Sequence, residues 1–169
     1  FKENGYATGL FFKWHLGDNY PFRPKDRGFE YVAWIKGGGT GQLPDYWDNT
    51  NNHAKILVND VLVDMTDEDD GIEGAFTTNF FFNRAMEFMD DNIKKEKPFF
   101  AYIPLGTAHA PHVSPPDARE GVNAKTGTIE NIDKIMGRLL KYLDDRGIAD
   151  NTILVFTTDN GGGTYLRGG

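Results

Sequence analysis

Two apolar runs of strand length flank a long helical pattern, and this order constrains the fold more than any other feature of the sequence. The runs are residues 99–104 and 152–157, and apolar side chains recur at helical spacing over residues 126–146. A strand, a helix and a second strand in this order predict a βαβ crossover, which requires parallel strands. We therefore expect an α/β fold with a mostly parallel sheet flanked by helices.

Further segments fit this class of fold. Residues 6–17 alternate between two faces and predict a strand, and residues 77–95 predict a second helix. Residues 56–58 and 61–63 are short apolar runs separated by two turn-forming residues, which is typical of a hairpin. The hairpin lies in an irregular insertion around residues 37–64.

Composition excludes several classes of protein. The chain of 169 residues has a formal net charge of −7 and no basic cluster, which argues against nucleic-acid binding. No apolar run approaches the about 20 residues that a membrane-spanning helix needs, and no signal peptide opens the chain. The absence of cysteine excludes disulfides and a cysteine nucleophile within these residues. Because the chain opens without Met and closes on Gly168-Gly169, we expect it to be a fragment.

Polar side chains follow the predicted strands, at the edge of the sheet where α/β proteins bind ligands. Asp159 and Asn160 follow residues 152–157 and supply a carboxylate and an amide oxygen, which are hard ligands suited to calcium or magnesium. An Asx-turn that ends the strand is the alternative for this sequence. His109 follows residues 99–104 in a proline-rich loop, and it is either a general acid or anion ligand, or a loop histidine without a role.

Lys13 and His15 lie at the end of the first predicted strand. In a strand over residues 6–17 they share one face, one pleat apart, so a cation and an imidazole lie side by side. Such a pair is suited to binding an oxyanion. The alternative is a half-exposed edge strand, in which lysine and histidine serve solubility.

Together these segments resemble the sulfatase family, the formylglycine-dependent members of the alkaline phosphatase superfamily. Residues 11–17, Phe-Phe-Lys-Trp-His-Leu-Gly, are similar to the family's Gly-Lys-Trp-His-Leu-Gly signature. Residues 98–112 resemble its central strand and histidine loop, and residues 151–161 resemble its metal-binding strand end. The motifs come in the family's order, so residues 1–169 are interpreted as the central part of a single sulfatase catalytic domain with an alkaline-phosphatase-like fold.

The resemblance implies a role for each matching residue. It implies that Asp159 and Asn160 bind the active-site calcium and that Lys13 contacts the formylglycine and the sulfate oxygens. It implies that His15 assists the formylglycine hydrate, and that His109 binds sulfate and helps the leaving oxygen depart. The implied activity is hydrolysis of a sulfate monoester in a sulfated small molecule or glycan, and the family favours a periplasmic or secreted location.

The chain departs from the family pattern in two respects. Phe12 stands where the family usually has Gly before the lysine, and the Cys/Ser-x-Pro-x-Arg motif that yields formylglycine is absent, as is a pair of metal-binding aspartates. The nucleophile is therefore expected outside this chain, and the chain alone is expected to be inactive. Two alternatives remain open: a phosphodiesterase or phosphonate hydrolase of the same superfamily, and a non-catalytic sulfate or glycan binder.

Overall fold

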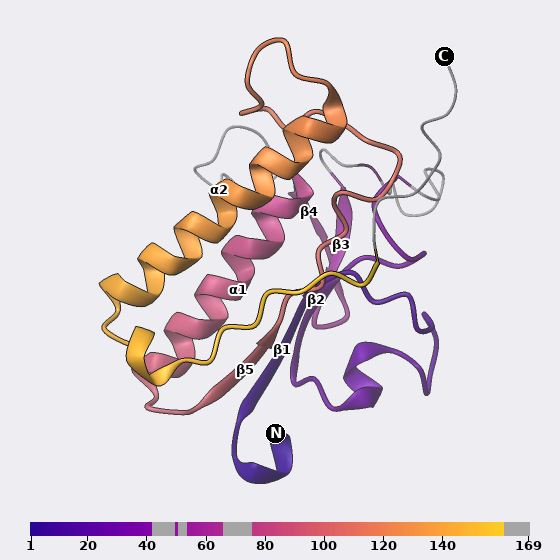
Figure 1. Ribbon diagram of the computed structural model, residues 1–169. Coiled ribbons are helices and arrows are strands. Elements are labelled where there is room, and N and C mark those ends of the chain that lie inside the picture. The colour runs from indigo at the N-terminus through magenta and orange to yellow at the C-terminus, as the bar shows by residue number, and fades with distance from the viewer. Residues whose placement is uncertain (42–49, 51–53, 66–75, 161–169) are drawn as a thin grey trace. The chain divides into compact units, whose positions relative to one another are not determined.

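The structure is a computed structural model that describes residues 1–41, 50, 54–65 and 76–160 (Figure 1). The chain divides into two compact parts, residues 1–135, which contain the sheet, and residues 136–169. Among the helices of the described residues, none combines the length and the apolar character that a membrane crossing requires.

Among the described residues of the first part, five strands form one sheet: β1 (Ala7–Phe12), β2 (Tyr31–Trp34), β3 (Lys55–Val58), β4 (Val61–Asp64) and β5 (Phe99–Tyr102). Their order across the sheet is β4-β3-β2-β1-β5. β1 pairs in parallel with both β2 and β5, whereas β3 pairs antiparallel with β2 and β4. The sheet is therefore mixed, and the predicted α/β class and the predicted hairpin are confirmed.

Both predicted helices form, close to their predicted bounds. They are α1 (Thr77–Lys94) and α2 (Ala124–Asp145). α2 begins after Asn123, whose side-chain oxygen accepts a hydrogen bond from the Thr126 N–H at 2.9 Å, as N-cap residues do. Gly147 follows α2 with a φ of 65°, the left-handed conformation that commonly ends helices. Short 3₁₀-helices lie at Lys2–Asn4, Pro24–Arg27 and Ala149–Asn151.

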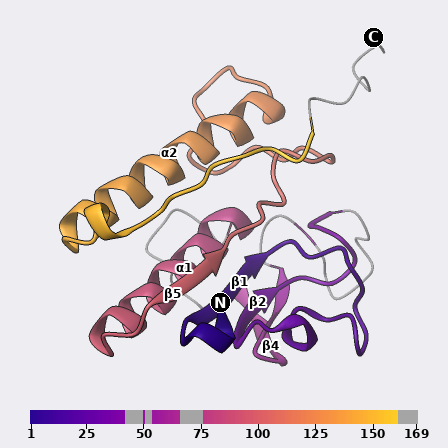
Figure 2. The same ribbon diagram turned by 60° about the horizontal axis from the view of Figure 1, so that its bottom comes forward.

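α1 lies on one face of the sheet (Figure 2), and aromatic rings join the two. Phe11 of β1 has its ring centroid 5.4 Å from that of Phe88, and Phe12 stacks on Phe81 at 4.4 Å. All six residues of β1 are buried, and β1 lies between two other strands. The alternative of a half-exposed edge strand is therefore wrong for this segment. The other face carries a second buried cluster, formed by Leu10, Val32 and Trp34.

The strand predicted over residues 152–157 is absent from the structure. Ile153 is 94% exposed and Val155 is 76% exposed. A strand requires neighbours that satisfy its backbone N–H and C=O groups, and none of the five described strands pairs with this segment. The predicted βαβ crossover would join this segment to a sheet in the other part of the chain, so it stays a prediction.

Candidate active site

Lys13 follows β1 directly, at the edge of the sheet where the parallel strands end. Its backbone N–H donates a hydrogen bond to the Pro104 carbonyl at 3.0 Å, so the chain that leaves β1 runs beside the chain that leaves β5. The parallel register, with Leu10 opposite Tyr102, brings both strands to this edge. Lys13, which is half-buried, and the loop that contains His109 therefore start from the same edge of the sheet.

Phe12 ends β1 in an unusual backbone conformation. Its φ is 106°, in the region that favours glycine. Its ring departs from the strand alternation and stacks on Phe81, on the same side of the sheet as the ring of Phe11. A Cβ at Gly106 would lie 2.5 Å from the Phe12 ring, so Gly106 leaves room for it. The family signature has glycine at position 12, and glycine adopts such a φ without strain. In this chain, burial of the Phe12 ring stabilises the strained backbone conformation.

Phe12→Gly is expected to preserve more stability than Phe12→Ala, although glycine is the weaker strand former elsewhere. Both variants lose the ring, which costs about 3 kcal/mol or more. Only glycine relieves the backbone strain. The free energy of unfolding of the Phe12→Gly variant should therefore exceed that of the Phe12→Ala variant by about 1 kcal/mol. Urea denaturation of a protein that carries this chain measures the difference. Equal stability, or a more stable alanine variant, would show that position 12 is unstrained.

His15 lies beyond the strand, so the predicted placement of Lys13 and His15 on one strand face is wrong. β1 ends before both residues, and His15 has a φ of 53°, which breaks the alternation of extended chain. Its exposed imidazole lies against Gly38, where a Cβ would lie 2.8 Å from the ring. The Gly37 N–H donates to Asp18 Oδ2 at 3.0 Å, which ties the loop after His15 to this glycine segment.

The loop after His15 is also fixed from its other side. Trp14 Nε1 donates to the Phe22 carbonyl at 2.7 Å, which folds the loop back onto the end of β1. Arg23 pairs with Asp26, with Nη2 and Oδ1 separated by 2.9 Å. The hydrogen bond from the Arg23 guanidinium holds the pKa of the Asp26 carboxyl below its ordinary value. These contacts give the segment around His15 a defined course.

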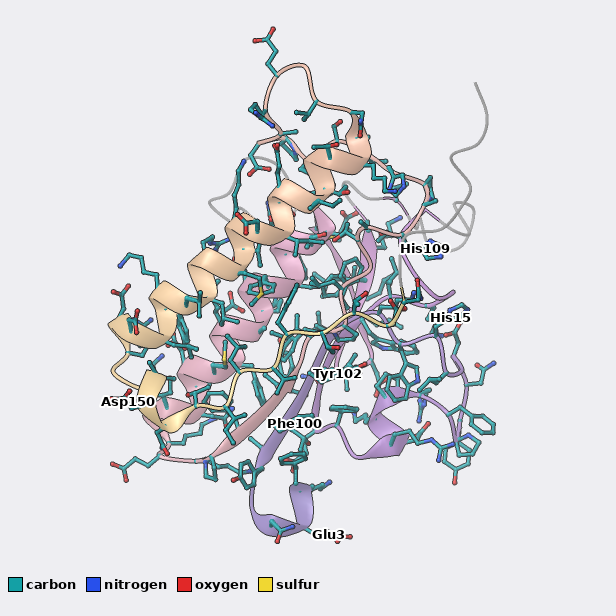
Figure 3. All side chains as sticks on the ribbon, viewed as in Figure 1. Glu3, His15, Phe100, Tyr102, His109 and Asp150 are labelled. Atoms are coloured by element: carbon teal, nitrogen blue, oxygen red, sulfur yellow. The ribbon has the colours of Figure 1, made fainter. Side chains whose placement is uncertain are left out.

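His109 is exposed in the loop after β5, and its imidazole is oriented locally. Nδ1 lies 2.6 Å from the Ala110 carbonyl oxygen. Because a carbonyl only accepts, Nδ1 is the donor of this hydrogen bond. The His109 N–H donates to the Gly106 carbonyl at 3.2 Å. Figure 3 shows His15 and His109 beyond the same end of β1.

Sequence reasoning missed the polar contacts that hold the histidine loop. Thr78 Oγ1, in the first turn of α1, lies 3.1 Å from Thr107 Oγ1, two residues before His109. Its neighbour Asn79 accepts a hydrogen bond from Asn131 of α2 at 3.1 Å. One signal could have identified Thr78: it falls on the apolar face of the helical pattern, where a polar residue needs a buried partner.

Asp159 and Asn160 belong to the second part of the chain. Both are exposed, and the Thr158 hydroxyl donates to the Asn160 carbonyl at 2.6 Å. Their side-chain oxygens are hard donors, so their chemistry fits part of a calcium coordination sphere. The described residues contain no group of three or more His, Cys, Asp or Glu that could hold a metal ion. Metal binding here, and convergence with Lys13 and His109, stay predictions.

The chain belongs to the sulfatase family, whose model matches residues 1–169. N-acetylgalactosamine-6-sulfatase of Canis lupus familiaris is 28% identical over 166 residues, which cover 95% of this chain and 31% of that protein. The ulvan-active sulfatase of Formosa agariphila is 25% identical over 189 residues, which cover 95% of this chain and 34% of that protein. The chain therefore spans about a third of the length of these relatives.

Solved structures share the fold. A sulfatase from Pseudoalteromonas sp. superposes with a TM-score of 0.64 at 17% identity, over 86% of this chain and 34% of that chain. A second structure, from work on the metabolism of multiple glycosaminoglycans by Bacteroides thetaiotaomicron, gives a TM-score of 0.71 at 24% identity, over 95% of this chain and 44% of that one. These likenesses support the α/β class that the strand order already defines.

Proposed function

We propose that this chain supplies part of the active site of a sulfatase that hydrolyses a sulfate monoester. One observation carries the proposal: Lys13 and the loop of His109 leave adjacent parallel strands at one edge of the sheet, joined by the hydrogen bond from Lys13 to Pro104. This edge is where α/β proteins bind their ligands. Family membership selects a sulfate ester among the anions that a lysine and a histidine could bind.

The residues suit the chemistry of sulfuryl transfer. A sulfuryl group in transfer resembles a phosphoryl group, with weak bonds to both partners and charge spread over its remaining oxygens. Catalysis then consists mostly of positioning and fixed positive charge. In the proposed site, the Lys13 ammonium binds sulfate oxygens. His109 Nε2–H gives its proton to the leaving oxygen as the S–O bond breaks, and His15 assists the nucleophile.

The nucleophile comes from outside these residues. The chain has no cysteine, and its one serine, Ser114, begins the sequence Ser-Pro-Pro-Asp-Ala. Ala118 therefore occupies the position where the Ser-x-Pro-x-Arg motif requires arginine. Formylglycine, supplied by another segment, would provide a hydrated aldehyde as the nucleophile toward sulfur.

Asp159 and Asn160 are the proposed calcium ligands of this chain. A bound calcium ion would neutralise negative charge on the sulfate oxygens. The carboxylate of Asp159 contributes charge, and the amide oxygen of Asn160 adds a neutral hard ligand. The other ligands would come from outside this chain.

The proposed substrate is a sulfated carbohydrate or an aryl sulfate. Two of the similar proteins are named as an N-acetylgalactosamine-6-sulfatase and an ulvan-active sulfatase. A third is named as an arylsulfatase, from Hemicentrotus pulcherrimus, at 29% identity. These names favour a sulfate ester over the phosphodiester alternative. A periplasmic or secreted location, which the family favours, is part of the proposal.

The test uses a longer protein that carries this chain together with a Cys/Ser-x-Pro-x-Arg segment. We expect it to hydrolyse nitrophenyl sulfate and a sulfated N-acetylgalactosamine, measured as released nitrophenolate and inorganic sulfate. Removal of calcium with a chelator should lower the rate by about 100-fold, and added calcium should restore it. Hydrolysis of a phosphodiester without hydrolysis of any sulfate ester would contradict the proposal. Binding of a sulfated sugar without turnover would instead favour the non-catalytic alternative.

A further inference from the structure

The histidine loop is held on both sides of His109 by one turn of α1. Before His109, the Thr107 hydroxyl lies 3.1 Å from the Thr78 hydroxyl. After it, Asp117 is joined to Asn79 through Asn131 of α2. Thr78 and Asn79 are consecutive residues in the first turn of α1, so a single turn of helix fixes both flanks of the loop.

Asn131 of α2 is the link between Asp117 and Asn79. Its Nδ2 donates to Asn79 Oδ1 at 3.1 Å and to Asp117 Oδ1 at 3.4 Å. Lys134 adds hydrogen bonds from Nζ to Asp117 Oδ2 at 2.8 Å and to the Asp117 carbonyl at 2.7 Å. Asn131 and Asn79 are each 2% exposed. Buried amides in contact define a single arrangement of the elements that carry them.

The side-chain oxygen of Asn131 differs from its Nδ2 group in its contacts. Its Oδ1 is buried and has no hydrogen-bond partner among the residues that the structure describes. A buried acceptor without a partner is unfavourable, and an apolar side chain of similar shape would avoid that cost. Leucine could not reproduce the two hydrogen bonds that Asn131 Nδ2 donates to Asn79 and Asp117. The specific contribution of Asn131 is therefore the placement of the loop.

We propose that Thr78 and Asn131 are positioning residues for His109, a role that rests on the proposed sulfatase function. They hold the loop so that the imidazole of His109 meets the leaving oxygen of the substrate. Neither residue touches the substrate in this proposal. Each acts through the loop, Thr78 through Thr107 and Asn131 through Asp117.

The test uses isosteric variants of the longer protein that carries the nucleophile segment. Asn131→Leu removes both donated hydrogen bonds at nearly constant shape, and Thr78→Val removes the bond to Thr107. Thr78→Ser retains a hydroxyl and is expected to restore the behaviour of the unmodified protein. Glu87→Ala is the matched control on α1, because Glu87 forms an exposed ion pair with Arg84, away from the loop.

Hydrogen–deuterium exchange gives a readout that does not depend on sulfatase activity. We expect Asn131→Leu and Thr78→Val to speed amide exchange over residues 106–118 by about 10-fold, with exchange in the interior of α1 unchanged. Thr78→Ser and Glu87→Ala should show normal exchange in both segments. Unchanged exchange over residues 106–118 in both isosteric variants would overturn the proposal, whatever the activity of the protein.

Two substrates distinguish the loss of His109 placement from a general loss of folded enzyme. An alkyl sulfate has a basic leaving oxygen that needs a proton, whereas nitrophenolate leaves without one. We expect each isosteric variant to lose about 30-fold in kcat/KM for an alkyl sulfate and about 3-fold or less for nitrophenyl sulfate. Equal losses on both substrates would overturn the positioning role. If the unmodified protein hydrolyses no sulfate ester, the proposed function fails, and the exchange experiment still decides the link between loop and helix.

Discussion

Lys13→Ala is expected to lower kcat/KM for a sulfate ester by about 1,000-fold. Lys13 is half-buried at the end of β1, where its backbone is fixed by the hydrogen bond to Pro104. In the proposed site, removal of its ammonium takes a preorganised positive charge from the oxygens of the reacting sulfuryl group. Because that charge matters most in the transition state, kcat should fall together with kcat/KM. Steady-state kinetics of the longer protein on nitrophenyl sulfate measure both constants.

Lys25→Ala is the matched control for this experiment. Lys25 is exposed and pairs with Asp60 at 3.0 Å, so its loss should change activity by less than about 2-fold. Lys13→Arg keeps the charge but replaces a compact ammonium with a planar fork, so we expect an intermediate loss. A folded Lys13→Ala protein with nearly full activity would remove Lys13 from the active site.

The parts of the fold that the sequence predicts correctly are those whose apolar side chains pack within the chain itself. α1 follows from the spacing of Phe81 and Phe88, because these rings lie against Phe12 and Phe11 of β1. The hairpin of β3 and β4 follows from two short apolar runs and the turn between them. For the hairpin, a local pattern is sufficient because the two strands are neighbours in sequence. For α1, a local pattern is sufficient because the apolar side chains recur on one face of the helix.

The strand predicted over residues 152–157 fails for the opposite reason. An apolar run indicates that a segment suits a buried strand, but only a neighbouring strand with unpaired backbone groups can complete it. The described strands provide no such pairing for Ile153 to Phe156, whose side chains are exposed. A periodic pattern therefore predicts the conformation that a segment favours, and not the presence of its partner.

Lys13 and His15 show a different limit of sequence reasoning. Their alternation predicts a shared strand face, but the positive φ values of Phe12 and His15 end the strand and redirect the chain. Neither phenylalanine nor histidine predicts a positive φ, and phenylalanine in particular rarely adopts one. The motif therefore predicts which residues belong to the candidate site, whereas their arrangement required the structure.

The contact between Asn79 and Asn131 cannot be predicted from any local pattern in the sequence. The two residues are 52 positions apart and meet only because α1 and α2 come together in the first part of the chain. No periodicity pairs one buried amide with another at that separation. The polar residue at the start of α1 is visible in the sequence, but its partner is a consequence of the fold.

His109→Gln is expected to remove most activity on substrates with basic leaving groups. Glutamine can occupy similar space and donate a hydrogen bond, but it cannot transfer a proton to the leaving oxygen. We expect kcat/KM to fall about 1,000-fold for an alkyl sulfate and about 10-fold for nitrophenyl sulfate, whose leaving group needs little protonation. Comparison of the two substrates in the longer protein measures this difference.

His112→Gln is the control for that substitution, because His112 lies in the same loop and is half-buried. Within the described part of the chain, its Nδ1 has no hydrogen-bond partner. Replacement by glutamine therefore leaves no other donor or acceptor without its partner, and both rates should stay within about 3-fold. If His109→Gln lowered both rates equally, proton donation would not be its role, and sulfate binding would account for the loss. The ratio of the two rates, and not the size of either loss, therefore identifies the general acid, since a binding defect affects both substrates alike.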